Sequence, residues 1–219
     1  MKKLSILLAV GLFLCALSSV PAQANTLTPG AAPVSPDVFT DAYLGNPANY
    51  IADTGIVSVS TGGGAPLLAD FRSVVVREPS GVLDFLYEVH NTGAAGVNES
   101  IERVTAINFK GYTVDVGYAD ESVVDLITGS AHTTPTTVNL SSIGDTVGWN
   151  FDALDPQEDS QVLVIKTDAT LFGQGVFQLL DGNIGQTSAF DPVPEPATML
   201  LLGSGLIGLA AYARRRFKK

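Results

Sequence analysis

Short segments that alternate apolar and polar residues recur about every 8 to 15 residues between Asp53 and Asp191, and they limit the folds open to this chain. In a strand, successive side chains point to opposite faces of the sheet. The clearest segment, residues 82–90, therefore has an apolar face and a polar face. The apolar side chains are Leu83, Phe85, Tyr87 and Val89, and the polar ones are Asp84, Glu88 and His90.

The remaining strand signals lead to an all-β prediction. We expect further strands at 56–60, 71–77, 112–118, 147–152, 162–165 and 176–180, with 176–180 the last; a bulged strand over 99–109; and candidates at 123–127 and 136–140. Residues 162–165 are apolar throughout, which is typical of a strand buried on both faces. No stretch between Asp53 and Asp191 carries a long helical stripe. The predicted fold is an antiparallel β-sandwich with Trp149 in its core.

The N-terminus has the pattern of a secretory signal peptide. Lys2 and Lys3 precede an apolar run over residues 4–17, and Ala22 and Ala24 form an A-x-A cleavage site. We expect cleavage after Ala24, which makes residues 1–24 the signal peptide.

Export and composition together limit the chemistry of the mature chain. Cys15 is the only cysteine and leaves with the signal peptide, so no disulfide, thiol nucleophile or thiolate ligand remains. Residues 25–193 hold 21 acidic and 5 basic residues, a net charge near −16. Such a surface repels nucleic acid, which we exclude as a partner, and suits divalent cations or neutral glycans better.

The C-terminus predicts a single membrane span. Residues 197–213 carry no charge and would extend about 26 Å as a helix, close to the thickness of a hydrocarbon core. A basic cluster follows and should hold the C-terminus on the cytoplasmic side. It comprises Arg214, Arg215, Arg216, Lys218 and Lys219.

The whole C-terminal segment resembles the PEP-CTERM sorting signal of Gram-negative bacteria. The matching parts are the motif Pro194, Glu195 and Pro196, the glycine-containing span and the basic cluster. The resemblance implies recognition by an exosortase as partner. It also implies an inner-membrane anchor before processing, followed by release to the cell surface or extracellular matrix, usually in bacteria that make exopolysaccharide.

These patterns divide the chain into four parts. They are a signal peptide at 1–24, a proline-rich, loosely ordered lead-in at 25–52, a β-sandwich ectodomain at 53–192, and the sorting signal at 193–219.

Candidate ligand residues gather in one acidic loop. Asp152, Asp155, Glu158 and Asp159 lie within eight residues and offer oxygen ligands to Ca²⁺. Their spacing is not that of an EF-hand, and a solvated acidic loop is the favoured interpretation. We expect both histidines, His90 and His132, to lie exposed on the surface.

The sequence favours a non-enzymatic role without a cofactor. Residues 25–193 contain no G-x-S-x-G motif. The leading hypothesis is a surface or matrix protein, structural or adhesive, that associates with exopolysaccharide. The alternative is a Ca²⁺-dependent carbohydrate-binding module.

Overall fold

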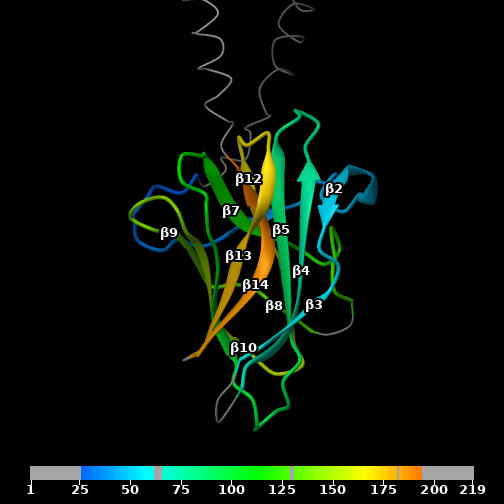
Figure 1. Ribbon diagram of the computed structural model, residues 1–219, viewed down its shortest axis with the longest axis vertical. Coiled ribbons are helices and arrows are strands. Elements are labelled where there is room, and N and C mark those ends of the chain that lie inside the picture. The colour runs from blue at the N-terminus through cyan, green and yellow to red at the C-terminus, as the bar shows by residue number, and fades with distance from the viewer. Residues whose placement is uncertain (1–25, 62–65, 129–130, 182, 194–219) are drawn as a thin grey trace, which may run out of the picture.

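The computed structural model describes residues 26–61, 66–128, 131–181 and 183–193, and this part of the chain is nearly all β. Its strands form a nine-stranded and a five-stranded sheet (Figure 1). The only helix among the described residues is the single 3₁₀ turn η1 (Pro47–Asn49). The all-β prediction is confirmed for this part of the chain.

The nine-stranded sheet is organised around the long strand β5 (Leu83–Asn91). One edge of β5 pairs with β4 and the other with β12 and β11. The other strands of this sheet are β1 (Asp37–Phe39), β2 (Tyr50–Asp53), β3 (Val57–Ser60), β4 (Leu68–Arg77), β7 (Val114–Ala119), β8 (His132–Thr133), β11 (Asp159–Ser160) and β12 (Val162–Thr167).

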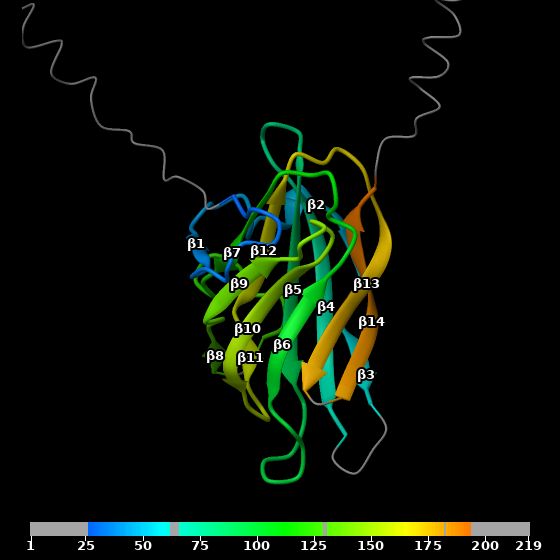
Figure 2. The same ribbon diagram turned by 90° about the vertical axis from the view of Figure 1, so that its left-hand side faces the viewer.

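The five-stranded sheet is antiparallel in the order β14-β13-β6-β10-β9. Figure 2 shows these strands side by side as one layer. Their bounds are β6 (Ile101–Ala106), β9 (Thr137–Leu140), β10 (Val147–Leu154), β13 (Phe172–Asp181) and β14 (Asn183–Pro192).

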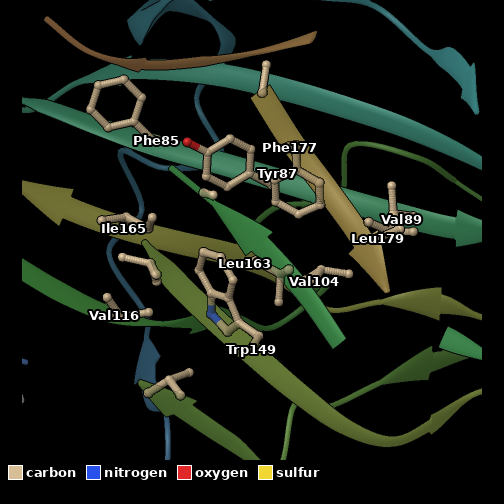
Figure 3. Close-up of a cluster of buried hydrophobic side chains, with 14 of the residues drawn as sticks. Phe85, Tyr87, Val89, Val104, Val116, Trp149, Leu163, Ile165, Phe177 and Leu179 are labelled. Atoms are coloured by element: carbon tan, nitrogen blue, oxygen red, sulfur yellow. The ribbon is translucent and has the colours of Figure 1, made fainter. Parts of the chain in front are cut away.

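The main core lies between the two sheets. Figure 3 shows Tyr87 from β5 beside Phe177 from β13 and Trp149 from β10, and all three are fully buried. The ring centroids of Tyr87 and Phe177 lie 5.0 Å apart, and those of Tyr87 and Trp149 lie 6.2 Å apart. Burial of each such side chain contributes about 1.5–3 kcal/mol. The apolar face of β5 therefore points into the main core, as its alternating pattern predicts.

A second apolar cluster covers the opposite face of the nine-stranded sheet. Leu86 and Val164 point outward from β5 and β12 and are fully buried. They pack in a cluster with Leu44 from the segment 39–50 and with Val124 and Leu126 from the loop 120–127. We call these two segments the outer layer. They turn a sheet face that the sequence presents as polar into a buried one.

The start of the folded domain differs from the prediction. Residues 26–52, expected as a loosely ordered lead-in, contribute β1, which pairs with β7, and β2, which pairs with β4. Leu44 is fully buried, and Leu27 belongs to the main core. The buried apolar side chains of this segment, Leu27, Phe39 and Leu44, are spaced too irregularly to give an alternating pattern.

Three further predictions need correction. The strand at 176–180 is not the last, because β14 follows and pairs with β13 over ten residue pairs. Residues 123–127 form part of a loop and no strand. Two strand pairs, β1 with β7 and β11 with β8, are parallel, so the nine-stranded sheet is mixed. The remaining strand predictions match observed strands, with ends that differ by several residues.

Several predictions lie outside the described residues: the signal peptide with Ala22 and Ala24, the motif Pro194, Glu195 and Pro196, the membrane span, and the cluster of Arg214, Arg215, Arg216, Lys218 and Lys219. Within the described part of the chain, no helix combines the length and the apolar character needed to cross a membrane.

Candidate functional site

The four residues of the predicted calcium loop have separate partners. Asp152 is exposed on β10, and Asp155 accepts a hydrogen bond of 2.5 Å from the Ser100 hydroxyl. Glu158 Oε2 accepts a hydrogen bond of 2.8 Å from the Thr133 hydroxyl and one of 3.1 Å from the backbone N–H of Asp155. Asp159 is buried and lies beside His90, with its Oδ1 2.5 Å from His90 Nδ1. In the described structure these four carboxylates do not converge on one point.

A different polar group is brought together on the outer face of β5. Glu88, at the middle of that strand, is fully buried beneath the outer layer. Its Oε2 accepts hydrogen bonds from the backbone N–H groups of Leu126 (2.6 Å) and Ile127 (2.9 Å). Burial raises the pKa of Glu88 to about 8, although these two donors act in the opposite direction. The loop 120–127 is thereby held onto the sheet by a buried carboxylate.

His132 from β8 faces the other oxygen of this carboxylate. Its Nε2 lies 3.5 Å from Glu88 Oε1, and its Nδ1 lies 2.5 Å from Glu121 Oε2. The imidazole is only 6% exposed, so the expectation of an exposed His132 is wrong. Asp125 places its Oδ1 4.0 Å from His132 Nε2 and remains 30% exposed. Burial also raises the pKa of Asp125.

Three of these residues satisfy a geometric condition for holding a metal ion. Glu88, Asp125 and His132 each offer one ligand atom, and the three atoms lie within 4.8 Å of one another. They come from β5, the loop 120–127 and β8, which are distant in sequence. Strand β11 lies between β5 and β8, and its parallel pairing with β8 matches Asp159 with His132, which places the histidine one strand away from β5.

A second polar group lies farther along the outer face of β5. The Tyr43 hydroxyl donates a hydrogen bond of 2.6 Å to Asp84 Oδ2 and lies 3.1 Å from Glu78 Oε1. Lys166 Nζ pairs with Asp41 Oδ2 at 2.7 Å and stands over the ring of Tyr43. Asp84 is fully buried, and burial raises its pKa to about 7.

Sequence reasoning treated Asp84, Glu88 and His90 as the solvated face of a strand. One signal for burial was present, because Leu86 lies on the same face between the two acidic residues. The covering segments carry no periodic pattern of their own, and their position depends on contacts between residues far apart in the chain.

Comparison with known proteins bears on the C-terminal segment. The family model described as the PEP-CTERM protein-sorting motif matches residues 192–216. The search of curated proteins finds no match to the chain, and neither does the search of solved structures. A motif of this kind implies export, membrane-anchored sorting with an exosortase as processing partner, and delivery to the cell surface. The chain thus carries a PEP-CTERM protein-sorting motif at residues 192–216.

Proposed function

We propose that this protein is a structural or adhesive component of the bacterial surface or extracellular matrix, associates with exopolysaccharide and has no catalytic activity of its own. The match of residues 192–216 to the sorting motif carries this proposal, because it assigns the protein to an exosortase. In the proposed route, a signal peptide at 1–24 directs export through the inner membrane of a Gram-negative bacterium. The span at 197–213 then anchors the chain until it is processed.

The junction between the folded domain and the motif supports this route. Strand β14 pairs with β13 as far as Pro192, and the Val193 N–H donates a hydrogen bond of 3.1 Å to the Leu171 carbonyl oxygen. The motif Pro194-Glu195-Pro196 therefore begins two residues after the end of a strand. We infer that the folded domain stays close to the membrane until processing releases it.

The charge of the mature chain supports a role beside polysaccharide rather than nucleic acid. A net charge near −16 over residues 25–193 repels polyanions at low salt and leaves neutral polymers unaffected. The alternative, a calcium-dependent carbohydrate-binding module built on Asp152, Asp155, Glu158 and Asp159, has no comparable support, because these carboxylates have separate partners.

The sorting step is tested by the double substitution Pro194→Ala with Pro196→Ala in cells that contain the exosortase. Proline restricts the backbone to extended geometry at these positions, and its replacement should remove the shape that the enzyme recognises. We expect membrane insertion to continue and release to stop, measured by fractionation and immunoblotting. Pro79→Ala, at an exposed proline outside the motif, is the control. Release of the double variant at the normal rate would refute the assignment.

The basic cluster and the adhesive role need separate tests. Replacement of the three arginines by glutamate should disturb the orientation of the span, which is measured by protease protection of the C-terminus. These residues are Arg214, Arg215 and Arg216.

For the adhesive role, the released protein is sedimented with exopolysaccharide purified from the same bacterium. We expect the protein to co-sediment with the polysaccharide at high salt as well as at low salt. Complete loss of co-sedimentation at high salt would contradict a specific association.

A further inference from the structure

The arrangement around Glu88 leaves two buried polar atoms facing each other without a hydrogen-bond partner. These atoms are Glu88 Oε1 and His132 Nε2, which lie 3.5 Å apart. Glu88 is fully buried and the His132 side chain is 6% exposed, so neither atom has ready access to solvent. A buried polar atom without a hydrogen-bond partner destabilises the folded state, and more so when it is charged. A ligand that binds both atoms would remove this cost.

Glu121 contacts the other ring nitrogen of His132. Its Oε2 lies 2.5 Å from His132 Nδ1, and Nε2 is the ring nitrogen that faces Glu88 Oε1. A neutral imidazole with its proton on Nδ1 would offer the Nε2 lone pair to a metal ion. A metal-ligating histidine commonly donates its other N–H to a carboxylate, which orients the ring and raises its basicity.

We propose that Glu88, Asp125 and His132 bind a divalent transition-metal ion of the zinc type, with Glu121 as the residue that positions His132. Zn²⁺ binds histidine nitrogen and carboxylate oxygen at about 2.0–2.2 Å. Two such ligands at a tetrahedral angle lie about 3.4 Å apart, close to the 3.5 Å between Glu88 Oε1 and His132 Nε2. Asp125 Oδ1, 4.0 Å from Nε2, belongs to a 30% exposed side chain that can close this gap.

The ligand set distinguishes this ion from Ca²⁺ and Mg²⁺. Ca²⁺ takes six to eight oxygen ligands, and Mg²⁺ demands an octahedral shell that usually retains several waters. One imidazole and two carboxylates suit Zn²⁺ better, with water in the remaining position. The exposed side of Asp125 provides the route for the ion and for that water. The proposed site is distinct from the acidic loop that the sequence suggested for calcium.

The competing occupant of this position is a proton. A protonated Glu88 could donate a hydrogen bond across the same gap, and burial raises the pKa of Glu88 to about 8. The two occupants differ in their response to chelators. EDTA removes a metal ion at constant pH and leaves a proton in place.

The test uses the full chain with Cys15→Ser, so that the thiol cannot bind the ion. After EDTA treatment and dialysis, Zn²⁺ is titrated by calorimetry, and the unfolding midpoint is measured with Zn²⁺, Mg²⁺, Ca²⁺ or no added ion. We expect one Zn²⁺ per chain and a rise of the midpoint specific to Zn²⁺, because the ion binds only the folded state. Co²⁺ at the same site should give the visible absorption of a four-coordinate ion.

Substitutions locate the ion. Asp125→Asn and His132→Gln should each weaken Zn²⁺ binding at least tenfold, and Glu121→Gln should weaken it about 10–100-fold. His90→Gln, at the other histidine, is the matched control and should leave the affinity unchanged. Asp125→Asn is the decisive variant, because this side chain is partly exposed and its loss should not unfold the protein.

Two results would overturn the site. One is a Zn²⁺ affinity that Asp125→Asn and His132→Gln leave unchanged. The other is an unfolding midpoint that changes with pH but is the same in Zn²⁺, Mg²⁺ and EDTA, which would identify the proton as the occupant.

Discussion

The indole Nε1 of Trp149 donates a hydrogen bond of 3.0 Å to the carbonyl oxygen of Gly117. Trp149 lies on β10 in the five-stranded sheet and Gly117 on β7 in the nine-stranded sheet, so this bond joins the two sheets. The indole is fully buried, and its one polar group is satisfied. Trp149 is therefore a core residue and offers no exposed face to a sugar.

Trp149→Ala should lower the free energy of unfolding by about 3–5 kcal/mol, because it removes a large buried side chain and leaves a cavity. That is a large part of a total of about 5–15 kcal/mol. Trp149→Phe keeps an aromatic ring but leaves the Gly117 carbonyl without its donor, and should cost roughly 1–3 kcal/mol. Urea unfolding of the mature protein measures both values.

Ile143→Ala is the control for Trp149, because Ile143 is 65% exposed and its truncation should change stability by less than about 0.5 kcal/mol. An unchanged unfolding midpoint for Trp149→Ala would contradict the buried position of the indole.

Gly117 also allows β1 to approach β7. A Cβ atom at this position would collide with the backbone of Asp37 at its carbonyl oxygen. Gly117→Ala should therefore displace β1, whose register pairs Asp37 with Gly117. We expect faster hydrogen exchange over residues 37–39, measured by mass spectrometry.

Gly185→Ala is the matched control for Gly117→Ala. Gly185 is a strand glycine as well, and the nearest atom to its added Cβ is Val59 Cγ1 at 3.3 Å, in a side chain that can shift. Equal exchange of residues 37–39 in both variants would show that β1 does not depend on the missing side chain.

Local patterns in the sequence predict the strands and the main core. In β5 the alternation of Leu83, Phe85 and Tyr87 with polar residues predicts which side chains enter the core, because that pattern follows directly from strand geometry. Residues 162–165 predict burial on both faces, and Leu163 and Val164 indeed belong to the two different apolar clusters.

The outer layer and the polar groups beneath it are not predictable in this way. The Glu88 carboxylate is held by Leu126 and Ile127, which lie 38 and 39 residues away in the chain. His132 reaches the same position through a two-residue strand, too short to produce a periodic signal. Burial of these groups depends on which loop covers which face, and composition does not encode that choice.

Tyr87 provides a second hydrogen bond between the sheets, from its hydroxyl to the Phe190 carbonyl oxygen at 2.7 Å. Tyr87→Phe keeps the packing against Phe177 but removes this donor, which should cost about 1–2 kcal/mol. Because Phe190 lies in β14, we also expect faster hydrogen exchange near the C-terminal end of that strand. Tyr118→Phe, at a half-buried ring, is the control for loss of a hydroxyl. Unaltered stability and exchange in Tyr87→Phe would rule out a contribution from this bond.

The buried carboxyl group of Asp84 should make the stability of the protein depend on pH. The group is fully buried, with Oδ1 unpartnered, and burial raises its pKa to about 7. The Tyr43 hydroxyl and Lys166 lower the pKa, whereas Glu78 and Asp41 raise it. In the unfolded chain the same group titrates near pH 3.9. Between these values the folded protein holds a proton that the unfolded chain releases, so acid favours the folded state.

The contribution of Asp84 to stability should be fully present below about pH 4 and lost as the pH rises through about 7. At about 1.4 kcal/mol for each pKa unit, the full effect is on the order of 4 kcal/mol. Asp84→Asn stays neutral and should remove this part of the pH dependence. The measurement is the free energy of unfolding of both proteins at several values from pH 4 to 8. Asp152→Asn, at an exposed carboxylate, controls for net charge. Parallel pH curves for wild type and Asp84→Asn would mean that the buried carboxyl group does not titrate in this range.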